Sequence, residues 1–226
     1  MPFKATGNAS EFEEIDRWEG GFGWIAHPEE DMRRASHALL DAGDVWVVDP
    51  VDAAGLDGLL AEEGEVAGVV VLLDRHKRDA AEVARRHDVS VHVPSWMNGV
   101  ADALDAPVEY LHAELGDTGY ELHRLVDNAF WQEAALYHGG DGTLVVPESL
   151  GTAPFFLAGE ERLGVHPVLR ISPPGVLRQF APERILVGHG HGVRDRTTEA
   201  LRDALDGSRR RMPGLYAQTL RRLVMG

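Results

Sequence analysis

The chain has 226 residues, and 37 acidic against 22 basic side chains give it a formal net charge of −15. This length suits one large domain or two small ones, and 44% hydrophobic residues are enough to build a core. The excess of carboxylates argues against general nucleic-acid binding, because attraction to phosphates requires a basic surface. No run of about 18 apolar residues is present, so the sequence predicts no membrane-spanning helix.

Two further features of the composition bear on the salt environment of the protein and on the residues that could hold a metal. Lys4 and Lys77 are the only lysines, and there is no cysteine. An acidic, lysine-poor surface that keeps arginine is typical of salt-adapted proteins, since about 1 M salt screens charge repulsion beyond about 3 Å. An ordinary acidic protein is the alternative. The N-terminus has no apolar secretory segment, which favours a cytoplasmic protein. Any metal would be held by histidines and carboxylates.

The first half of the chain predicts alternating strands and helices. After a polar segment of residues 1–20, the expected elements are a strand at 21–25, a hairpin of 35–40 and 45–48, a helix from Leu56 to Gly64, a buried strand at 66–73, a helix at 77–87 and a strand at 89–93. The residues Asp41–Asp44 provide the hairpin turn, and Asp49-Pro50 ends its second strand.

The second half changes to a period of two and then returns to helix. The expected elements are strands at 108–110, 120–125, 133–137, 143–146 and 185–187, followed by helices at 197–211 and 215–224 on either side of Pro213. No linker or internal repeat divides the chain, so we expect residues 1–226 to form one domain. Strands and helices alternate in each half, which favours an α/β fold of two sheets packed face to face with helices outside.

Groups capable of chemistry follow four of the predicted strands. They are the cluster Asp74–Asp79, then Asp127, Glu148, and His189 in the stretch Gly188-His-Gly-His-Gly192. Strand ends are common places for active sites in layered α/β proteins. A mixture of histidines and carboxylates suits zinc, iron or manganese. We interpret His191 as a rim or surface residue. The glycine-rich stretch lacks the lysine and the spacing of a phosphate-binding loop.

The order and spacing of these elements resemble the metallo-β-lactamase superfamily, from the Ala35–Asp49 hairpin to the Gly-His-Gly turn. The family's His-x-His-x-Asp-His loop would be Asp74–Asp79, its later aspartate Glu148, and its terminal histidine His189. The resemblance implies a four-layer αββα sandwich and metal-dependent hydrolysis of an ester, thioester or phosphoester by activated water. The metal ligands it implies are Asp74, His76, Asp127, Glu148 and His189, with Asp79 as catalytic base or second-metal ligand.

The departures from the family pattern change the functional expectation. Within the loop, only the second histidine remains, as His76, while Asp74 stands at the first histidine and Arg78 at the aspartate. The family's middle histidine should fall near residues 127–131, where Asp127 is the best substitute. A fixed cation at Arg78 repels a divalent ion. We therefore expect a degenerate site in a protein that is non-catalytic or binds a small molecule or a partner chain. The alternative is a hydrolase with a single divalent metal.

Overall fold

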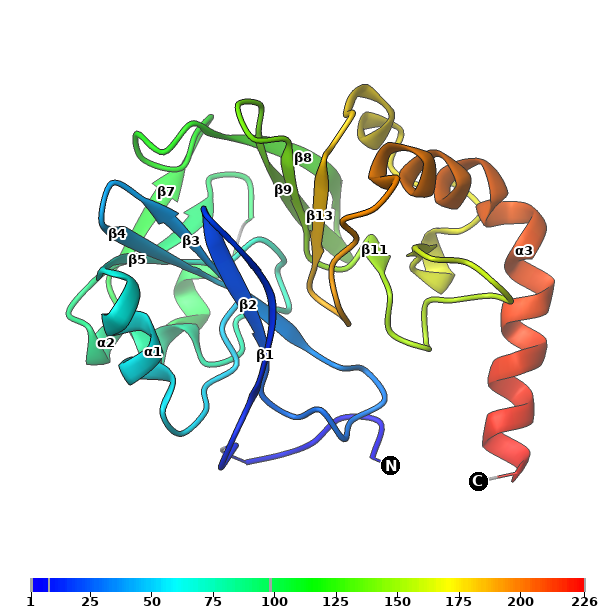
Figure 1. The fold of residues 1–226 in the computed structure, drawn as a ribbon, viewed down its shortest axis with the longest axis horizontal. Helices are drawn as coiled ribbons and strands as arrows, with labels where there is room; N and C mark the ends of the chain where they lie inside the picture. Colours follow the sequence, from blue (N-terminus) through cyan, green and yellow to red (C-terminus); the bar gives the residue numbers. More distant parts are fainter. Residues whose placement is uncertain (1, 8, 98, 226) are drawn as a thin grey trace.

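The structure, a computed structural model, describes residues 2–7, 9–97 and 99–225, without the side chains of residues 218–225. Its strands form two main sheets that pack face to face, with helices on the outer sides (Figure 1). This arrangement confirms the predicted αββα sandwich. Within the described part of the chain, no helix is long and apolar enough to cross a membrane.

The first sheet has the strand order β1 to β7. Its strands are β1 (Glu13–Trp18), β2 (Gly21–Ile25), β3 (Ala35–Asp41), β4 (Asp44–Val48), β5 (Glu65–Val70), β6 (Val91–Pro94) and β7 (Val108–Leu111). Pairing is antiparallel from β1 to β4 and parallel from β4 to β7. Parallel neighbours need crossover connections, and the helices α1 (Leu56–Glu63) and α2 (Ala80–Arg86) supply two of them.

The second sheet has the order β13-β10-β9-β8. Its strands are β8 (Tyr120–Asn128), β9 (Trp131–His138), β10 (Thr143–Val146) and β13 (Arg184–Val187), and a separate pair is formed by β11 (Leu150–Gly151) and β12 (Gly164–Val165). Helix α3 (Thr197–Met225) packs on its outer face through Leu201 and Leu205. Short 3₁₀ helices lie at Ala101–Ala103, Pro167–Leu169 and Gly175–Gln179.

A single apolar core joins the two sheets. Val47 and Val69 of the first sheet share it with Leu136, Val145 and Leu186 of the second. Burial of this surface is the main favourable contribution to folding. Strands β10 and β13 are parallel, so their carboxyl ends reach the same edge. The chain after β5 reaches the start of β9, because Leu73 and Glu133 form an isolated bridge. The fold therefore brings three of the four predicted strand ends together.

Several elements differ from those expected from the sequence. Strand β1 was not expected, because its only buried residue is Ile15 and four of its other five residues are charged. Strand β5 ends at Val70, and the next apolar residues bond to β9 instead: Ala134 N donates to Leu72 O at 2.8 Å. Helix α3 continues through Pro213 and bends along its length in Figure 1. A proline removes one helix hydrogen bond and kinks the helix without necessarily ending it.

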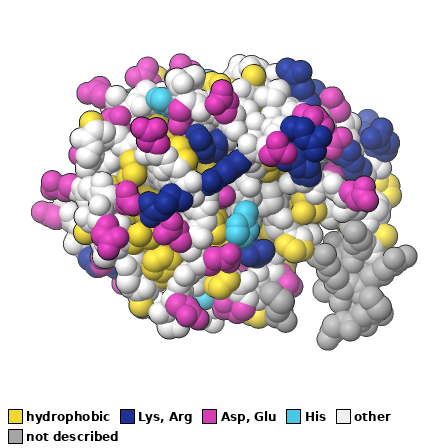
Figure 2. Space-filling model, viewed as in Figure 1, with side chains coloured by type: hydrophobic (Ala, Val, Ile, Leu, Met, Phe, Trp, Pro, Cys, Tyr) yellow, Lys and Arg dark blue, Asp and Glu magenta, His cyan; other side chains and the backbone are white. Residues whose placement is uncertain are grey.

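The surface is predominantly acidic in composition but not uniform. Figure 2 shows acidic side chains spread over one face, with lysine and arginine side chains gathered near its centre and at its upper right. In a chain of net charge −15, such a gathering of cations marks a place where the local potential departs from the average.

Candidate functional site

Three of the five predicted metal ligands meet at the edge where the strand ends converge. His76 follows β5, Glu148 follows β10, and His189 follows β13. One ligand atom from each lies within 4.8 Å of the other two. His76 Nε2 is 3.8 Å from Glu148 Oε2, and His189 Nε2 is 4.0 Å from Glu148 Oε1. All three side chains are buried, so their interactions are only weakly screened by solvent.

Both histidines are held in the tautomer that leaves Nε2 with a lone pair. His76 Nδ1 donates to Asp49 Oδ2 at 3.1 Å, and His189 Nδ1 donates to the carbonyl oxygen of Met32 at 3.0 Å. Burial, reinforced by nearby cationic Arg78, holds the pKa of each ring well below its ordinary value. Both rings are therefore neutral at pH 7. Partners of this kind on Nδ1 commonly orient metal-ligating histidines.

Glu148 lies between the two histidines on a loop that Glu133 organises. Arg75 Nε donates to Glu148 Oε2 at 3.0 Å, and burial raises the pKa of Glu148. The Glu133 carboxyl accepts hydrogen bonds from Trp131 Nε1, from the backbone N–H groups of Glu148 and Ser149, and from Ser149 Oγ, at 2.5 to 2.8 Å. Burial raises the pKa of Glu133 to about 7. Glu133 thus fixes the position of Glu148 through the backbone.

Arg78 occupies the centre of the loop and carries a charge with no direct carboxylate partner in the described part of the chain. Its Nη1 donates to the carbonyl oxygens of Ala35 and Asp49, both at 2.7 Å, and its Nη2 donates to Gly188 O at 3.1 Å. Nη2 also lies 3.3 Å from His76 Nε2. Burial lowers the pKa of Arg78 to about 10, which leaves the group cationic at neutral pH.

The backbone at this position is strained. Arg78 has a φ of 39° and Asp49 a φ of 46°, in the left-handed region that residues other than glycine seldom adopt. Such conformations cost about 1–3 kcal/mol each and persist only where the surroundings enforce them. Here the enforcing contacts are the hydrogen bond from Arg78 to Asp49 O and that from Leu72 N to Asp49 Oδ1 at 2.9 Å.

The donor set fits one divalent ion and not two. Two neutral imidazoles and one carboxylate are ligands that zinc, iron and manganese accept, although the lone pair of His76 Nε2 faces Arg78 Nη2 at 3.3 Å. Arg78 adds no further ligand, because a guanidinium offers no lone pair to a metal.

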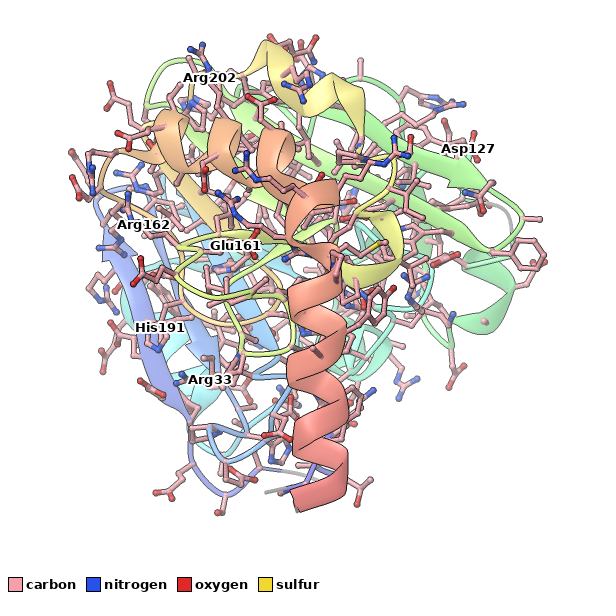
Figure 3. The ribbon with its side chains drawn as sticks, turned by 90° about the vertical axis from the view of Figure 1, so that its right-hand side faces the viewer. Arg33, Asp127, Glu161, Arg162, His191 and Arg202 are labelled. Atoms are coloured by element: carbon pink, nitrogen blue, oxygen red, sulfur yellow. The ribbon has the colours of Figure 1, made fainter. Side chains whose placement is uncertain are left out.

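The other predicted residues lie outside this cluster. Asp74 Oδ2 accepts from Gln132 N at 3.1 Å, and Asp79 Oδ2 accepts from Asp52 N at 2.8 Å. Asp127 accepts from Gln132 Nε2 at 2.9 Å and from Arg124 at the exposed end of β8. In Figure 3 it lies at the opposite side of the molecule from Arg33 and His191. Nothing in their geometry supports roles for Asp74 and Asp127 as ligands or for Asp79 as base, and these roles stay predictions.

His166 belongs to the site and was not expected from the sequence. Its Nδ1 accepts from Val168 N at 3.3 Å, so Nε2 carries the hydrogen and faces Glu148 Oε1 at 3.7 Å. Burial, with Arg75 nearby, lowers its pKa to about 3. The residue follows no apolar strand and matches no motif, so only its place before Pro167 signals an extended backbone. Asp49 had a clearer signal, as an acid directly after an apolar strand.

The cluster lines a cavity of about 210 Å³. Its basic lining residues are Lys4, Arg34, Arg75 and Arg78, and Phe3 and Met32 add apolar surface. The N-terminal segment forms part of the wall, because Asp31 N donates to Pro2 O at 3.0 Å and Met32 N donates to Phe3 O at 3.2 Å.

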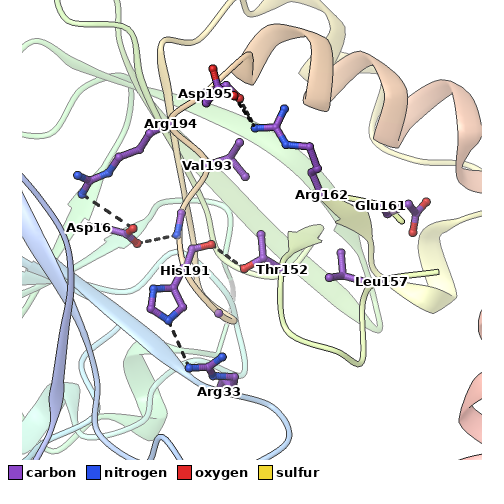
Figure 4. A pocket seen from close by; sticks show the side chains of 12 residues that line it. Asp16, Arg33, Thr152, Leu157, Glu161, Arg162, His191, Val193, Arg194 and Asp195 are labelled. Carbon is purple, nitrogen blue, oxygen red and sulfur yellow. Dashed lines mark hydrogen bonds and ion pairs between the residues drawn. The ribbon is translucent and has the colours of Figure 1, made fainter. Parts of the chain in front are cut away.

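A larger, more open hollow of about 700 Å³ lies beside Gly190–Gly192 (Figure 4). His191 is on its rim, with its side chain 45% exposed and Nε2 3.3 Å from Arg33 Nη2. This agrees with the interpretation of His191 as a rim residue. Asp16 and Asp195 form ion pairs with Arg194 and Arg162 there, so the charges of this hollow largely neutralise one another.

Comparison with known proteins places the fold. No protein-family model and no curated protein sequence matches the chain. Among solved structures, DIM-1 metallo-β-lactamase exposed to ceftazidime matches with a TM-score of 0.60 and 12% identity, over 89% of this chain and 100% of that one. A metallo-β-lactamase from Hirschia baltica matches with a TM-score of 0.61 and 9% identity, over 87% of this chain and 97% of that one. TMB-1 matches with a TM-score of 0.59 and 12% identity, over 88% of this chain and 98% of that one.

The structural similarity extends over nearly the whole length of both chains in each comparison. The sequence identity is too low to assign the activity of these proteins to this chain. What the chain shares with these structures is the fold, and a shared fold does not establish a shared activity. The chain therefore has the metallo-β-lactamase fold.

Proposed function

We propose that the protein binds a small molecule in the cavity above His76, Glu148 and His189 and does not hydrolyse it. One observation carries the proposal: the Arg78 guanidinium lies 3.3 Å from His76 Nε2. A metal bound to that nitrogen at about 2.1 Å would lie within a few ångströms of the cation. At about 4 Å and an effective dielectric constant of about 20, a divalent ion and a guanidinium repel by about 8 kcal/mol. That repulsion would offset a large part of the binding free energy of a metal.

Arg78 cannot easily withdraw to make room. Its three carbonyl acceptors belong to β3, to the end of β4 and to the loop after β13, so a different rotamer would lose hydrogen bonds to three segments. Charged hydrogen bonds contribute about 1.5–3 kcal/mol each. The guanidinium is thus a fixed part of the site.

A hydrolase with a single metal is the second candidate, and the three convergent donors favour it. A zinc, iron or manganese ion on His76, Glu148 and His189 would supply Lewis-acid chemistry toward an ester, thioester or phosphoester. In that case Asp49 and the Met32 carbonyl would keep both histidines in the ligating tautomer.

Elemental analysis of protein purified in concentrated salt and without a histidine tag separates the two candidates. We expect far less than one zinc, iron or manganese per chain, and no hydrolysis of ester, thioester or phosphoester substrates with added metal. Stoichiometric metal that is lost in both His76→Ala and His189→Ala, together with hydrolysis of one of these substrates, would establish the hydrolase instead. His191→Ala, on the rim, is the matched control and should leave the metal content unchanged.

A further inference from the structure

The lining of the 210 Å³ cavity is strongly basic in an acidic protein. Among the described side chains that line the cavity, four are cationic and one, that of Glu148, is a carboxylate. Glu30 neutralises Arg34 at 2.8 Å, and Arg75 is paired with Glu148 at 3.0 Å. Lys4 and Arg78 are left without an ion-pair partner in the described residues. The lining of the cavity therefore carries an excess of positive charge, from Lys4 and Arg78.

Two cations in this cavity have no carboxylate partner among the described residues, and one buried ring nitrogen has no hydrogen-bond partner. The Lys4 ammonium makes no hydrogen bond or ion pair with any described residue, although it lines the cavity. The Arg78 guanidinium contacts carbonyl oxygens and His76 rather than an acid. His189 Nε2 is shielded from solvent and has no hydrogen-bond partner, in a side chain only 4% exposed. An unpartnered buried polar atom is unfavourable, so His189 Nε2 favours an incoming ligand, and the exposed Lys4 ammonium is available to bind one.

The tautomer of His189 adds a requirement beyond negative charge. Because Nδ1 donates to Met32 O, Nε2 is an acceptor and needs a donor hydrogen. A fully deprotonated carboxylate or a sulfate has none to give. Hydrogen phosphate and hydroxy acids combine an oxyanion with an O–H group. The cavity is also smaller than the roughly 300–1,000 Å³ of sites for drug-sized ligands, which restricts the ligand to a few heavy atoms.

We infer that this cavity binds a small oxyanion that carries a hydroxyl group, either hydrogen phosphate or a small hydroxycarboxylate. Lys4 donates directly to the oxyanion, Arg78 supplies fixed positive charge at the floor, and His189 Nε2 accepts the hydroxyl hydrogen. The inference rests on the proposed function, because a resident metal would occupy the same nitrogen of His189.

Isothermal titration calorimetry on protein shown to be metal-free tests this, with four probes at one fixed ionic strength set by KCl. The probes are inorganic phosphate, sulfate, lactate and acetate, which form two pairs that differ in the hydroxyl group. We expect phosphate to bind at least about tenfold more tightly than sulfate, or lactate than acetate, because one charge-assisted hydrogen bond is worth about that factor. The pair that shows the difference identifies the source of the oxyanion.

The two lysines of the chain provide a variant and its control. Lys4→Met should weaken binding of the preferred probe about tenfold or more, and the exposed position makes misfolding no concern. Lys77→Met should bind as the unchanged protein does, since Lys77 Nζ donates to Asp74 O at 2.7 Å and does not line the cavity. Binding of no probe, equal binding within both pairs, or full affinity in Lys4→Met would overturn the inference. Stoichiometric metal in the purified protein would overturn the proposed function itself, whatever the titrations gave.

Discussion

At the scale of single residues, Arg78 is the side chain on which the interpretation of the site depends. Its guanidinium donates hydrogen bonds to segments of both sheets, at Ala35 and Gly188, and so cross-links them beside His76.

Replacing this arginine by an acid should recover metal binding. In Arg78→Asp the repulsive cation is gone and a carboxylate stands near His76, Glu148 and His189, so we expect zinc to bind at least about 100-fold more tightly than to the unchanged protein. The variant should also unfold more easily without metal, since three carbonyl hydrogen bonds are lost. Zinc titration followed by the unfolding midpoint measures both effects.

Arg33→Asp is the control for this change, because it makes the same change in charge at the hollow of about 700 Å³ beside Gly190–Gly192. It should leave zinc affinity near that of the unchanged protein. If Arg78→Asp folds and binds zinc no better than the control does, repulsion by Arg78 is not what keeps the metal out.

The same scale shows what the sequence could predict of the site. His76, Glu148 and His189 were found because each follows an apolar strand, and strand ends converge in layered folds. Asp127 was chosen by spacing, but the β8–β9 register shifts between Arg124 and Val126, so spacing along the chain does not give position. Lys4 and Arg34 reach the cavity, and His166 reaches Glu148, through tertiary contacts for which no local sequence pattern exists.

At the scale of elements, the β3–β4 hairpin was predicted best because its turn is chemically specific. Asp41 pairs with Asp44, and Ala42 and Gly43 between them have φ values of 51° and 98°. Two-residue hairpin loops require positive φ at both positions, which glycine adopts without strain. Elements without such a signal were missed or misjudged: β1 is a polar edge strand, and α3 passes through the proline that was expected to end it.

This turn gives two substitutions with opposite expected effects. Ala42→Gly removes a Cβ from a left-handed residue and should raise the free energy of unfolding by about 1 kcal/mol. Gly43→Ala places a Cβ in the same region and should lower it by about 1 kcal/mol or more. Denaturant unfolding of both variants beside the unchanged protein measures the difference. Equal stability of the three proteins would contradict the strain assigned to Ala42.

At the scale of the whole molecule, the net charge of −15 predicts that stability depends on salt. Like charges destabilise a compact state, and the screening length falls from about 10 Å at 0.1 M salt to about 3 Å at 1 M. We expect the free energy of unfolding to rise markedly between dilute buffer and molar KCl, as measured by thermal or urea unfolding at constant pH. A fold equally stable in both would remove the support for salt adaptation.

Residues 2–5 lie against the cavity, and they contribute Phe3 and Lys4 to it while Ala5 N donates to buried Glu30 at 2.9 Å. The start of the chain and the occupant of the cavity therefore protect each other. A bound ligand would slow proteolytic cleavage of this segment, and cleavage after Lys4 would release the ligand.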